Sequence, residues 1–466
     1  MSYSAAIDGL HSLAGELVTK PGAPRRKFRL EEMRILLAEL GDPQLRFPSV
    51  LIAGTNGKGS TSATLASILA AAGYKVGLYT SPHLIRINER VRILRPRAHG
   101  LGDELRPQTV EEIADDDFAA RYFQVDEAVS KLVVDGRLPD HSSFFEAMTA
   151  LAFLHFAAEK VDIAVLEVGM GGRLDATNVG EPLVAVITDI SLDHTEWLGS
   201  TIDAIAREKA GILRPNGVMV TLPQLREANE ALGEIAVAMG VRGVNAADYI
   251  PAPDAARDSI GNRYPVWVMG EAVEIDSPLA GQHQQRNIAL AIAAAAELRN
   301  SHGYNLSAAD IVRGVKETRW PGRLELFPGN GERADILLDV AHNPAGAWAL
   351  RSAVSWLADA QPARPKTLVF GCLRDKAIAD MAQILFPLFD KVVVTPVDSP
   401  RSASAEDVLA AAASTGMNAQ AARDSSDALV WALEGTPANG LVVVAGSVYL
   451  VGSIRGLLTN AAGGAQ

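Results

Sequence analysis

The stretch Ala53-Gly54-Thr55-Asn56-Gly57-Lys58-Gly59-Ser60 joins an apolar run over 50–53 to an alanine-rich run over 63–72. Leucine and isoleucine recur at helical spacing in the second run, so the pattern predicts a buried strand, a glycine-rich turn and the start of a helix. Glycines let several backbone N–H groups approach an anion, and the helix start and Lys58 add positive charge. The stretch therefore predicts a nucleotide-phosphate site, with the hydroxyl of Ser60 or Thr61 available to Mg²⁺. A glycine-rich turn with a surface lysine is the simpler alternative.

The spacing of this turn departs from the common phosphate-binding pattern G-x-x-x-x-G-K-[ST]. That pattern would require a glycine where Ile52 stands and a hydroxyl where Gly59 stands. The variant G-T-N-G-K-G-S instead resembles the ATP loop of the Mur ligase superfamily, and within it the loop of the folylpolyglutamate synthase/dihydrofolate synthase family. The resemblance implies ATP binding by Gly54, Thr55, Asn56, Gly57, Lys58, Gly59 and Ser60.

The composition of the whole chain is typical of an acidic globular enzyme. Its 466 residues are 48% hydrophobic and 21% charged, and the formal net charge is −12. The length predicts two domains, and the acidic charge disfavours nucleic acid and anionic membranes as partners. A single cysteine excludes an internal disulfide framework, and the chain has no run of 18 apolar residues that would predict a membrane span. The N-terminal residues lack the apolar core of a signal peptide, so we expect a cytoplasmic protein.

Three candidate Mg²⁺ ligands follow predicted buried strands. Ser81 follows a strand over 75–79, Glu167 ends a strand that begins at 162, and His194 follows a strand over 183–190. Polar groups beyond the carboxyl ends of parallel strands form ligand sites, and a carboxylate at the end of an apolar strand favours a metal. Taken alone, Ser81 is more typical of a turn, and His194 of a hydrogen-bonded core histidine.

The strings around these residues extend the family resemblance. TSPHL…NER contains Ser81, LEVG-x-GGR-x-DATN contains Glu167, and D-H-x-x-x-L-G contains His194. The resemblance implies that Ser81 and Glu167 bind one Mg²⁺ and that His194 binds a second. It adds the hydroxyl of Ser60 to the metal ligands and allows a K⁺ ion as a further cofactor.

A predicted helix over 202–213 carries the string REKAGI, in which Lys209 is the third residue. By charge pattern alone, a salt-bridged helix face is the ordinary interpretation. The resemblance instead implies that Lys209 is carbamylated and helps to hold the second Mg²⁺ as a carboxylate-like ligand. The expected catalytic residues are therefore Lys58, Glu167, His194 and Lys209.

The same resemblance assigns the pterin or folate substrate to three segments. The first is a basic loop over 20–28, which would otherwise be a solvated surface loop. The second begins a helix over 143–159, where serine followed three residues later by glutamate is also a capping signal. The third is the GGRLDATN string. The implied residues are Arg25, Phe145, Glu146, Arg173, Leu174 and Asp175.

The expected fold class is α/β with two domains. A Pro-Gly break predicts a hinge at 319–323 between an N-terminal domain over 1–318 and a C-terminal domain over 324–466. The first has a mostly parallel phosphate-loop sheet flanked by helices, and the smaller second is Rossmann-like, with strands near 335–339, 367–371, 391–395 and 441–445. Residues 95–117 show no period and predict an exposed insertion. The strings G-x-H-Q-x-x-N and D-x-A-H-N-P, with the linker arginine, resemble those of the family and imply ATP contacts from Asn287, Arg323, Asp339 and His342.

Together these strings imply an ATP-dependent ligase that joins L-glutamate to dihydropteroate, to folylpoly-γ-glutamate or to both, through an acyl phosphate. A Mur-type ligase acting on another carboxylate, a P-loop ATPase without ligase activity and a folate-binding protein without turnover are the alternatives. The DVAHNP string in a second domain argues against the ATPase, and the GGRLDATN string argues against a UDP-muramyl substrate. The expected partners are small-molecule substrates, and we expect a monomer.

Overall fold

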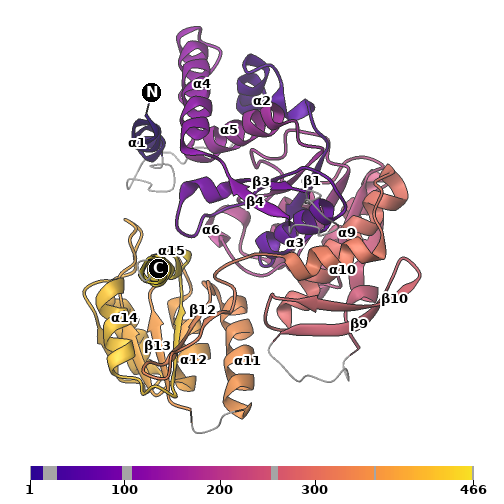
Figure 1. Cartoon of the computed structure of the whole chain (residues 1–466). Helices are drawn as coiled ribbons and strands as arrows, with labels where there is room; N and C mark the ends of the chain where they lie inside the picture. The colour runs from indigo at the N-terminus through magenta and orange to yellow at the C-terminus, as the bar shows by residue number, and fades with distance from the viewer. Residues whose placement is uncertain (1, 14–28, 97–107, 253–260, 361–363, 464–466) are drawn as a thin grey trace.

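The computed structural model describes residues 2–13, 29–96, 108–252, 261–360 and 364–463. Within them the chain forms two α/β units, each built on its own sheet and joined through the segment around 319–323 (Figure 1). The expected α/β class is confirmed. Arg25, which was predicted to contact the pterin, lies outside the described residues.

The first sheet has eight strands in the order β4-β3-β2-β5-β1-β6-β7-β8. Its central strands run parallel, so their carboxyl ends share one edge, and β1 lies between β5 and β6. The pairings at one side, β2 with β3 and β3 with β4, are antiparallel, so among the described strands of this sheet β3 alone runs opposite to the others. The strands are β1 Ser49–Ala53, β2 Val76–Tyr79, β3 Val91–Arg95, β4 Thr109–Glu112, β5 Ile163–Glu167, β6 Val184–Ile187, β7 Val218–Thr221 and β8 Arg242–Asn245.

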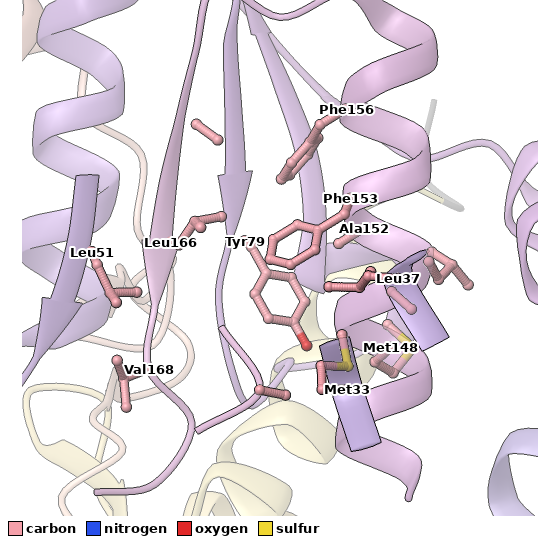
Figure 2. Packing of buried hydrophobic residues seen from close by; sticks show 14 of the residues in the cluster. Met33, Leu37, Leu51, Tyr79, Met148, Ala152, Phe153, Phe156, Leu166 and Val168 are labelled. Atoms are coloured by element: carbon pink, nitrogen blue, oxygen red, sulfur yellow. The ribbon is translucent and has the colours of Figure 1, made fainter. Parts of the chain in front are cut away.

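Helices cover both faces of this sheet because its central strands are apolar on both sides. Val50 and Ile52 of β1 belong to one buried cluster and Leu51 to the other, as the alternation of a strand requires. Figure 2 shows the second cluster, in which Tyr79 lies among the aromatic side chains of α5, and its hydroxyl lies 3.1 Å from Thr149 Oγ1. The helices of this unit are α1 Tyr3–Leu13, α2 Leu30–Glu39, α3 Lys58–Ala71, α4 Asp115–Val134, α5 Phe144–Glu159, α6 Thr195–Leu198, α7 Ile202–Ala210, α8 Arg226–Met239, α9 His283–His302 and α10 Ala308–Glu317.

A separate antiparallel hairpin, β9 Asn262–Val268 and β10 Glu271–Ser277, packs against α10 (Figure 1). The second sheet has the order β11-β12-β16-β13-β14-β15, with β11 antiparallel and the others parallel. Its strands are β11 Glu325–Phe327, β12 Asp335–Leu338, β13 Lys366–Phe370, β14 Lys391–Val394, β15 Ala419–Ala421 and β16 Leu441–Ala445. Its helices are α11 Pro344–Ala360, α12 Ile378–Leu385, α13 Ala405–Ser414, α14 Ser425–Glu434 and α15 Val448–Gly463.

Two local expectations were wrong. Residues 95–117 are not simply an exposed insertion, because residues 109–112 form the edge strand β4 and α4 already begins at Asp115. The strand predicted over 183–190 ends at Ile187, and His194 instead precedes the short helix α6 as its N-cap residue. In the part of the chain that the structure describes, no helix is both long and apolar enough to cross a membrane.

Candidate active site

A cavity of about 620 Å³ lies at the carboxyl edge of the first sheet and is closed on one side by residues of the second α/β unit. Every residue that the family resemblance assigns to ATP or metal lines this one cavity, although these residues come from segments far apart in the sequence. They are Gly54, Thr55, Asn56, Gly57, Lys58, Gly59, Ser60, Ser81, Glu167, His194, Lys209, Asn287, Arg323, Asp339 and His342.

The phosphate loop connects β1 to α3 with tight backbone geometry. Gly57 has φ +89°, where a side chain is strained, and it directly precedes α3. A Cβ on Gly59 would lie 2.5 Å from the Trp320 ring, so this glycine is needed for the linker to approach the loop. Lys58 Nζ donates to the carbonyl oxygens of Gly54 and Thr55 at 3.1 and 3.2 Å. The Lys58 ammonium is therefore held only by neutral carbonyl oxygens, and a negatively charged phosphate can replace them as its partner.

Glu167 ends β5 beside the phosphate-loop strand, where it pairs in register with Ile52. Its carboxylate is 4% exposed and accepts the Ser81 backbone N–H at 3.1 Å. Burial raises the pKa of Glu167, and Lys58 and the Ser81 N–H oppose that rise. A buried carboxylate with this little compensation is well suited to a cation.

Lys209 is 3% exposed and donates from Nζ to Gly54 O at 2.8 Å. The interpretation of this helix as a salt-bridged face holds for the two residues before Lys209. Arg207 pairs with Asp203 and Glu234, and Glu208 pairs with Arg173. No such pair forms at Lys209 among the described residues. Burial, helped by the charge of Lys58, lowers the pKa of Lys209 to about 7. A neutral amine is therefore well populated near neutral pH.

His194 has a left-handed backbone, with φ 51° and ψ 38°, which is uncommon for a residue other than glycine. Burial lowers the pKa of His194 to about 4, although the neighbouring Asp193 opposes that shift. The imidazole is therefore neutral at physiological pH and able to donate a lone pair to a cation.

The donor set fits a nucleotide-bound Mg²⁺ rather than an all-protein metal cage. Among the described residues, no cluster of three or more His, Cys, Asp or Glu side chains could hold a metal ion alone. Mg²⁺ is usually bound through one or two carboxylates together with substrate phosphates and water. The Glu167 carboxylate and the Ser60 and Ser81 hydroxyls beside the phosphate loop match that arrangement.

Sequence reasoning missed the contact that joins the two α/β units across the cavity. The Asp193 carboxylate accepts from Lys376 Nζ at 2.8 Å and from Asn343 Nδ2 at 3.2 Å, and His342 Nε2 lies 3.7 Å away. Asn343 Nδ2 also donates to Asn56 Oδ1 at 3.0 Å. Burial alone would raise the pKa of Asp193, but these cationic and hydrogen-bonding neighbours hold it far below its usual range. The only sequence signal for Asp193 was its place directly before His194, and Lys376 had none.

A second missed pair supports the phosphate loop from α9. Arg286 makes a bidentate pair with the Asp189 carboxylate, with N···O distances of 2.6 to 2.9 Å. The Asp189 backbone carbonyl accepts the N–H groups of Thr55 and Asn56 at 2.8 and 3.1 Å. Arg286 thus fixes the segment that holds the loop backbone in place.

Those predicted pterin-binding residues that the structure describes do not line this cavity, and several have structural partners. Glu146 and Ser143 form the reciprocal cap at the start of α5, which bears out the alternative interpretation of that spacing. Asp175 accepts the N–H groups of Gly169 and Met170 at 3.0 Å, and so organises the loop after β5. Three other predicted pterin residues are described: Phe145, which packs against Tyr79, Arg173, which pairs with Glu208, and the exposed Leu174.

Two family models match the chain: the Mur ligase middle domain over residues 109–295 and the Mur ligase, glutamate ligase domain over residues 322–448. The fold, the phosphate loop and these matches define an ATP-dependent ligase of the Mur type, an enzyme class that forms amide bonds. The folylpolyglutamate synthase of Lacticaseibacillus casei is 32% identical over 98% of both chains. The dihydrofolate synthase/folylpolyglutamate synthase of Bacillus subtilis is 34% identical over 94% of both. The chain belongs to the folylpolyglutamate synthase/dihydrofolate synthase family.

Solved structures agree with this assignment. The Mycobacterium tuberculosis folylpolyglutamate synthase complexed with ADP and AMPPCP has a TM-score of 0.82 at 31% identity, covering 98% of both chains. Escherichia coli FolC in complex with DHPP and ADP has a TM-score of 0.79 at 28% identity, covering 99% of this chain and 98% of that one. The predicted family and the two-domain α/β architecture are therefore confirmed, whereas the roles of individual residues stay predictions.

Proposed function

We propose that this protein uses ATP to join L-glutamate to the carboxyl group of dihydropteroate, of folylpoly-γ-glutamate or of both, through an acyl phosphate. The carrying observation is that Lys58, the buried Glu167 and the buried Lys209 meet in a single cavity bounded by both α/β units. The membership in a family of glutamate ligases, and the Escherichia coli FolC structure in complex with DHPP and ADP, support the choice of substrates.

In the first step, an oxygen of the acceptor carboxylate attacks the γ-phosphorus of ATP, and ADP leaves with the electrons of the broken P–O bond. Lys58 Nζ would leave the Gly54 and Thr55 carbonyls for the phosphate oxygens, where its charge stabilises the transferring group. In the second step, the amine of glutamate attacks the acyl carbon, phosphate leaves and the nitrogen loses a proton. Closure about 319–323 would bring the two α/β units together around both steps.

Mg²⁺ would neutralise negative charge on the phosphates when it is bound with the nucleotide. Ser60, Ser81 and Glu167 are the residues proposed to hold one ion, and His194 and Lys209 a second. On the nucleotide side, Asn287, Arg323, Asp339 and His342 are proposed to contact ATP, since all four line the same cavity as the phosphate loop.

Lys209 is proposed to act as a carbamate. Its neutral amine would attack CO₂ and lose a proton, which converts a buried cation into an anionic oxygen ligand. The lowered pKa of Lys209 and its lack of an ion pair among the described residues support this proposal. An ammonium at the same place would repel a divalent cation by a few kcal/mol or more at about 4 Å.

The proposed domains are 1–318 and 324–466 with the linker 319–323, and the protein is proposed to act as a cytoplasmic monomer.

The test of the proposed activity is a coupled assay of ADP release and product mass with L-glutamate, comparing dihydropteroate with reduced folates. ATP turnover that requires both a folate-type acceptor and glutamate is the expected result. Lys58→Ala should abolish it, and Lys316→Ala, at an exposed lysine paired with Asp276, should not. Turnover without an acceptor would favour the ATPase alternative, and turnover only with another carboxylate would favour a different Mur-type substrate.

A further inference from the structure

Arg90 is a buried arginine whose charge has no carboxylate partner among the described residues. It ends the short 3-10 helix η3, Ile87–Arg90, and the residue is 9% exposed to solvent. Its Nε donates to His83 Nδ1 at 3.0 Å, and its guanidinium carbon lies 5.2 Å from the centre of the Phe144 ring. Within the described ranges, its two terminal amino groups make no hydrogen bond and no ion pair.

The surroundings orient this guanidinium without neutralising it. His83 accepts the Arg90 Nε–H through its Nδ1, so the imidazole is a hydrogen-bond acceptor that brings no negative charge. Phe144 offers the face of a ring, which attracts a cation but carries no net charge. Arginine stays protonated even when buried, and a buried charge without a counter-ion is strongly unfavourable. The site is therefore arranged for an anion that arrives from outside the described chain.

Arg92, two residues further along, shows the usual alternative. It is equally buried, but it pairs with Glu89 at 3.5 Å and lies over the Trp320 ring at 5.4 Å. Both of its faces are thus occupied by the protein itself. Arginines in this part of the sheet can therefore have a carboxylate partner, and the lack of one at Arg90 among the described residues is particular to that position.

Arg90 lies between the phosphoryl-transfer residues and the aromatic residues at the start of α5. Its carbonyl accepts the Thr80 N–H at 3.0 Å, which fixes it at the exit of β2, and the next residue, Ser81, binds Glu167. On its other side, Phe144 begins α5. The carboxylates of Glu167 and Glu89 act on its charge only from a distance, without a direct ion pair. Arg90 does not line the 620 Å³ cavity, so the phosphates of ATP are not its natural anion.

We propose that Arg90 binds the acceptor carboxylate, the group that is phosphorylated in the first step. This inference rests on the proposed function. Arg90 holds one carboxylate oxygen so that the other is free to attack the γ-phosphorus. After the transfer, the held oxygen is the carbonyl oxygen of the acyl phosphate, and it gains negative charge when the glutamate amine attacks. The same guanidinium then stabilises that charge as a hydrogen-bond donor, without gaining or losing a proton.

The experiment is a double-mutant cycle between the protein and the acceptor. Arg90→Met and the wild type are each measured with an acceptor and with its analogue in which the reacting carboxylate is a carboxamide. We expect Arg90→Met to weaken acceptor binding 30-fold or more, with the affinities for AMPPCP and the KM for glutamate changed less than threefold. The carboxamide should bind both proteins equally. Arg90→Lys should fall between the two, because it keeps the charge but loses the planar fork.

Two controls keep the inference separable from other effects. Arg214→Met removes a partly buried arginine that pairs with Glu181 outside the cavity, and it should leave the acceptor KM within twofold. A melting temperature of Arg90→Met at or above that of the wild type would show that the variant is folded. Unchanged acceptor affinity in Arg90→Met, or a selective rise in the KM for glutamate, would overturn the inference while the wild type remains an active folate ligase. A wild type that is inactive with every folate acceptor would instead contradict the proposed function.

Discussion

Replacing Lys209 by methionine should make the protein more stable while abolishing ligation. The lysine is 3% exposed, and its pKa falls from an ordinary 10.5 to about 7 in the folded protein. Folding at pH 8 therefore releases a proton that the unfolded chain holds firmly. By proton linkage this release costs about 3 kcal/mol of folding free energy. Methionine has a similar apolar stem and no charge, so Lys209→Met removes the cost.

The substitution also removes one hydrogen bond, from Lys209 Nζ to Gly54 O at 2.8 Å. Losing such a bond costs about 1 kcal/mol, and the Gly54 carbonyl keeps its bond from Lys58. The net expectation is a gain of about 2 kcal/mol at pH 8. Because the folded pKa of a base is lowered here, the cost is fully present below pH 7 and disappears as the pH rises toward 10.5. The gain should therefore shrink to nearly zero by about pH 10.

The assay is the free energy of unfolding from urea titrations at several pH values between 7 and 10. The buffers contain EDTA and exclude CO₂, so that neither metal nor carbamate alters Lys209. Lys316→Met, at an exposed lysine, is the control and should change stability by less than about 0.5 kcal/mol at every pH. A Lys209→Met protein that is less stable than the wild type at pH 8, or a difference that does not vary with pH, would refute this reasoning.

Four further results are expected. Lys58→Ala should lower kcat for ligation at least 100-fold, about 3 kcal/mol of transition-state stabilisation, and near-normal turnover would contradict its role at the phosphates. Asp193→Asn keeps the shape of the side chain but weakens its pair with Lys376; kcat should fall about tenfold while AMPPCP affinity stays within threefold, and small-angle scattering should report a larger radius of gyration. In the metal-free protein, burial should hold the imidazole of His194 neutral down to about pH 4, so its NMR titration should show no step near pH 6.5. Lys209→Ala should be nearly inactive and partly rescued by short carboxylates, whereas full activity without them would leave a purely structural lysine.

Local sequence rules predicted the phosphate loop well because the signal is local. A buried strand, left-handed glycines and a helix start follow one another within about twenty residues, and each is set by its own neighbours. The same holds for the reciprocal cap of Ser143 and Glu146 on α5. The three-residue strands β11 and β15 were missed because edge strands of this length carry almost no alternation.

The missed parts of the site depend on contacts between distant segments. Asp193 and Lys376 are 183 residues apart, and nothing around Lys376 indicates that a carboxylate from the other α/β unit will meet it. Short-range sequence patterns also do not show whether a given side chain is buried. The charge pattern of residues 207–209 is that of an exposed helix face, and only the packed structure shows that Lys209 points inward while Arg207 and Glu208 pair outside.

Because Trp320 packs against Gly59, two positions that are more than 250 residues apart in the sequence cannot change independently during evolution. A serine at Gly59 would restore the G-K-[ST] end of the usual phosphate-loop pattern, but its Cβ would meet the indole ring at 2.5 Å. A chain that carries the hydroxyl there must therefore carry a smaller residue at 320 or a displaced linker. Substitutions at the two positions should consequently appear together when sequences of this family are aligned, and a loop transplanted from another P-loop protein should fail unless the linker is exchanged with it.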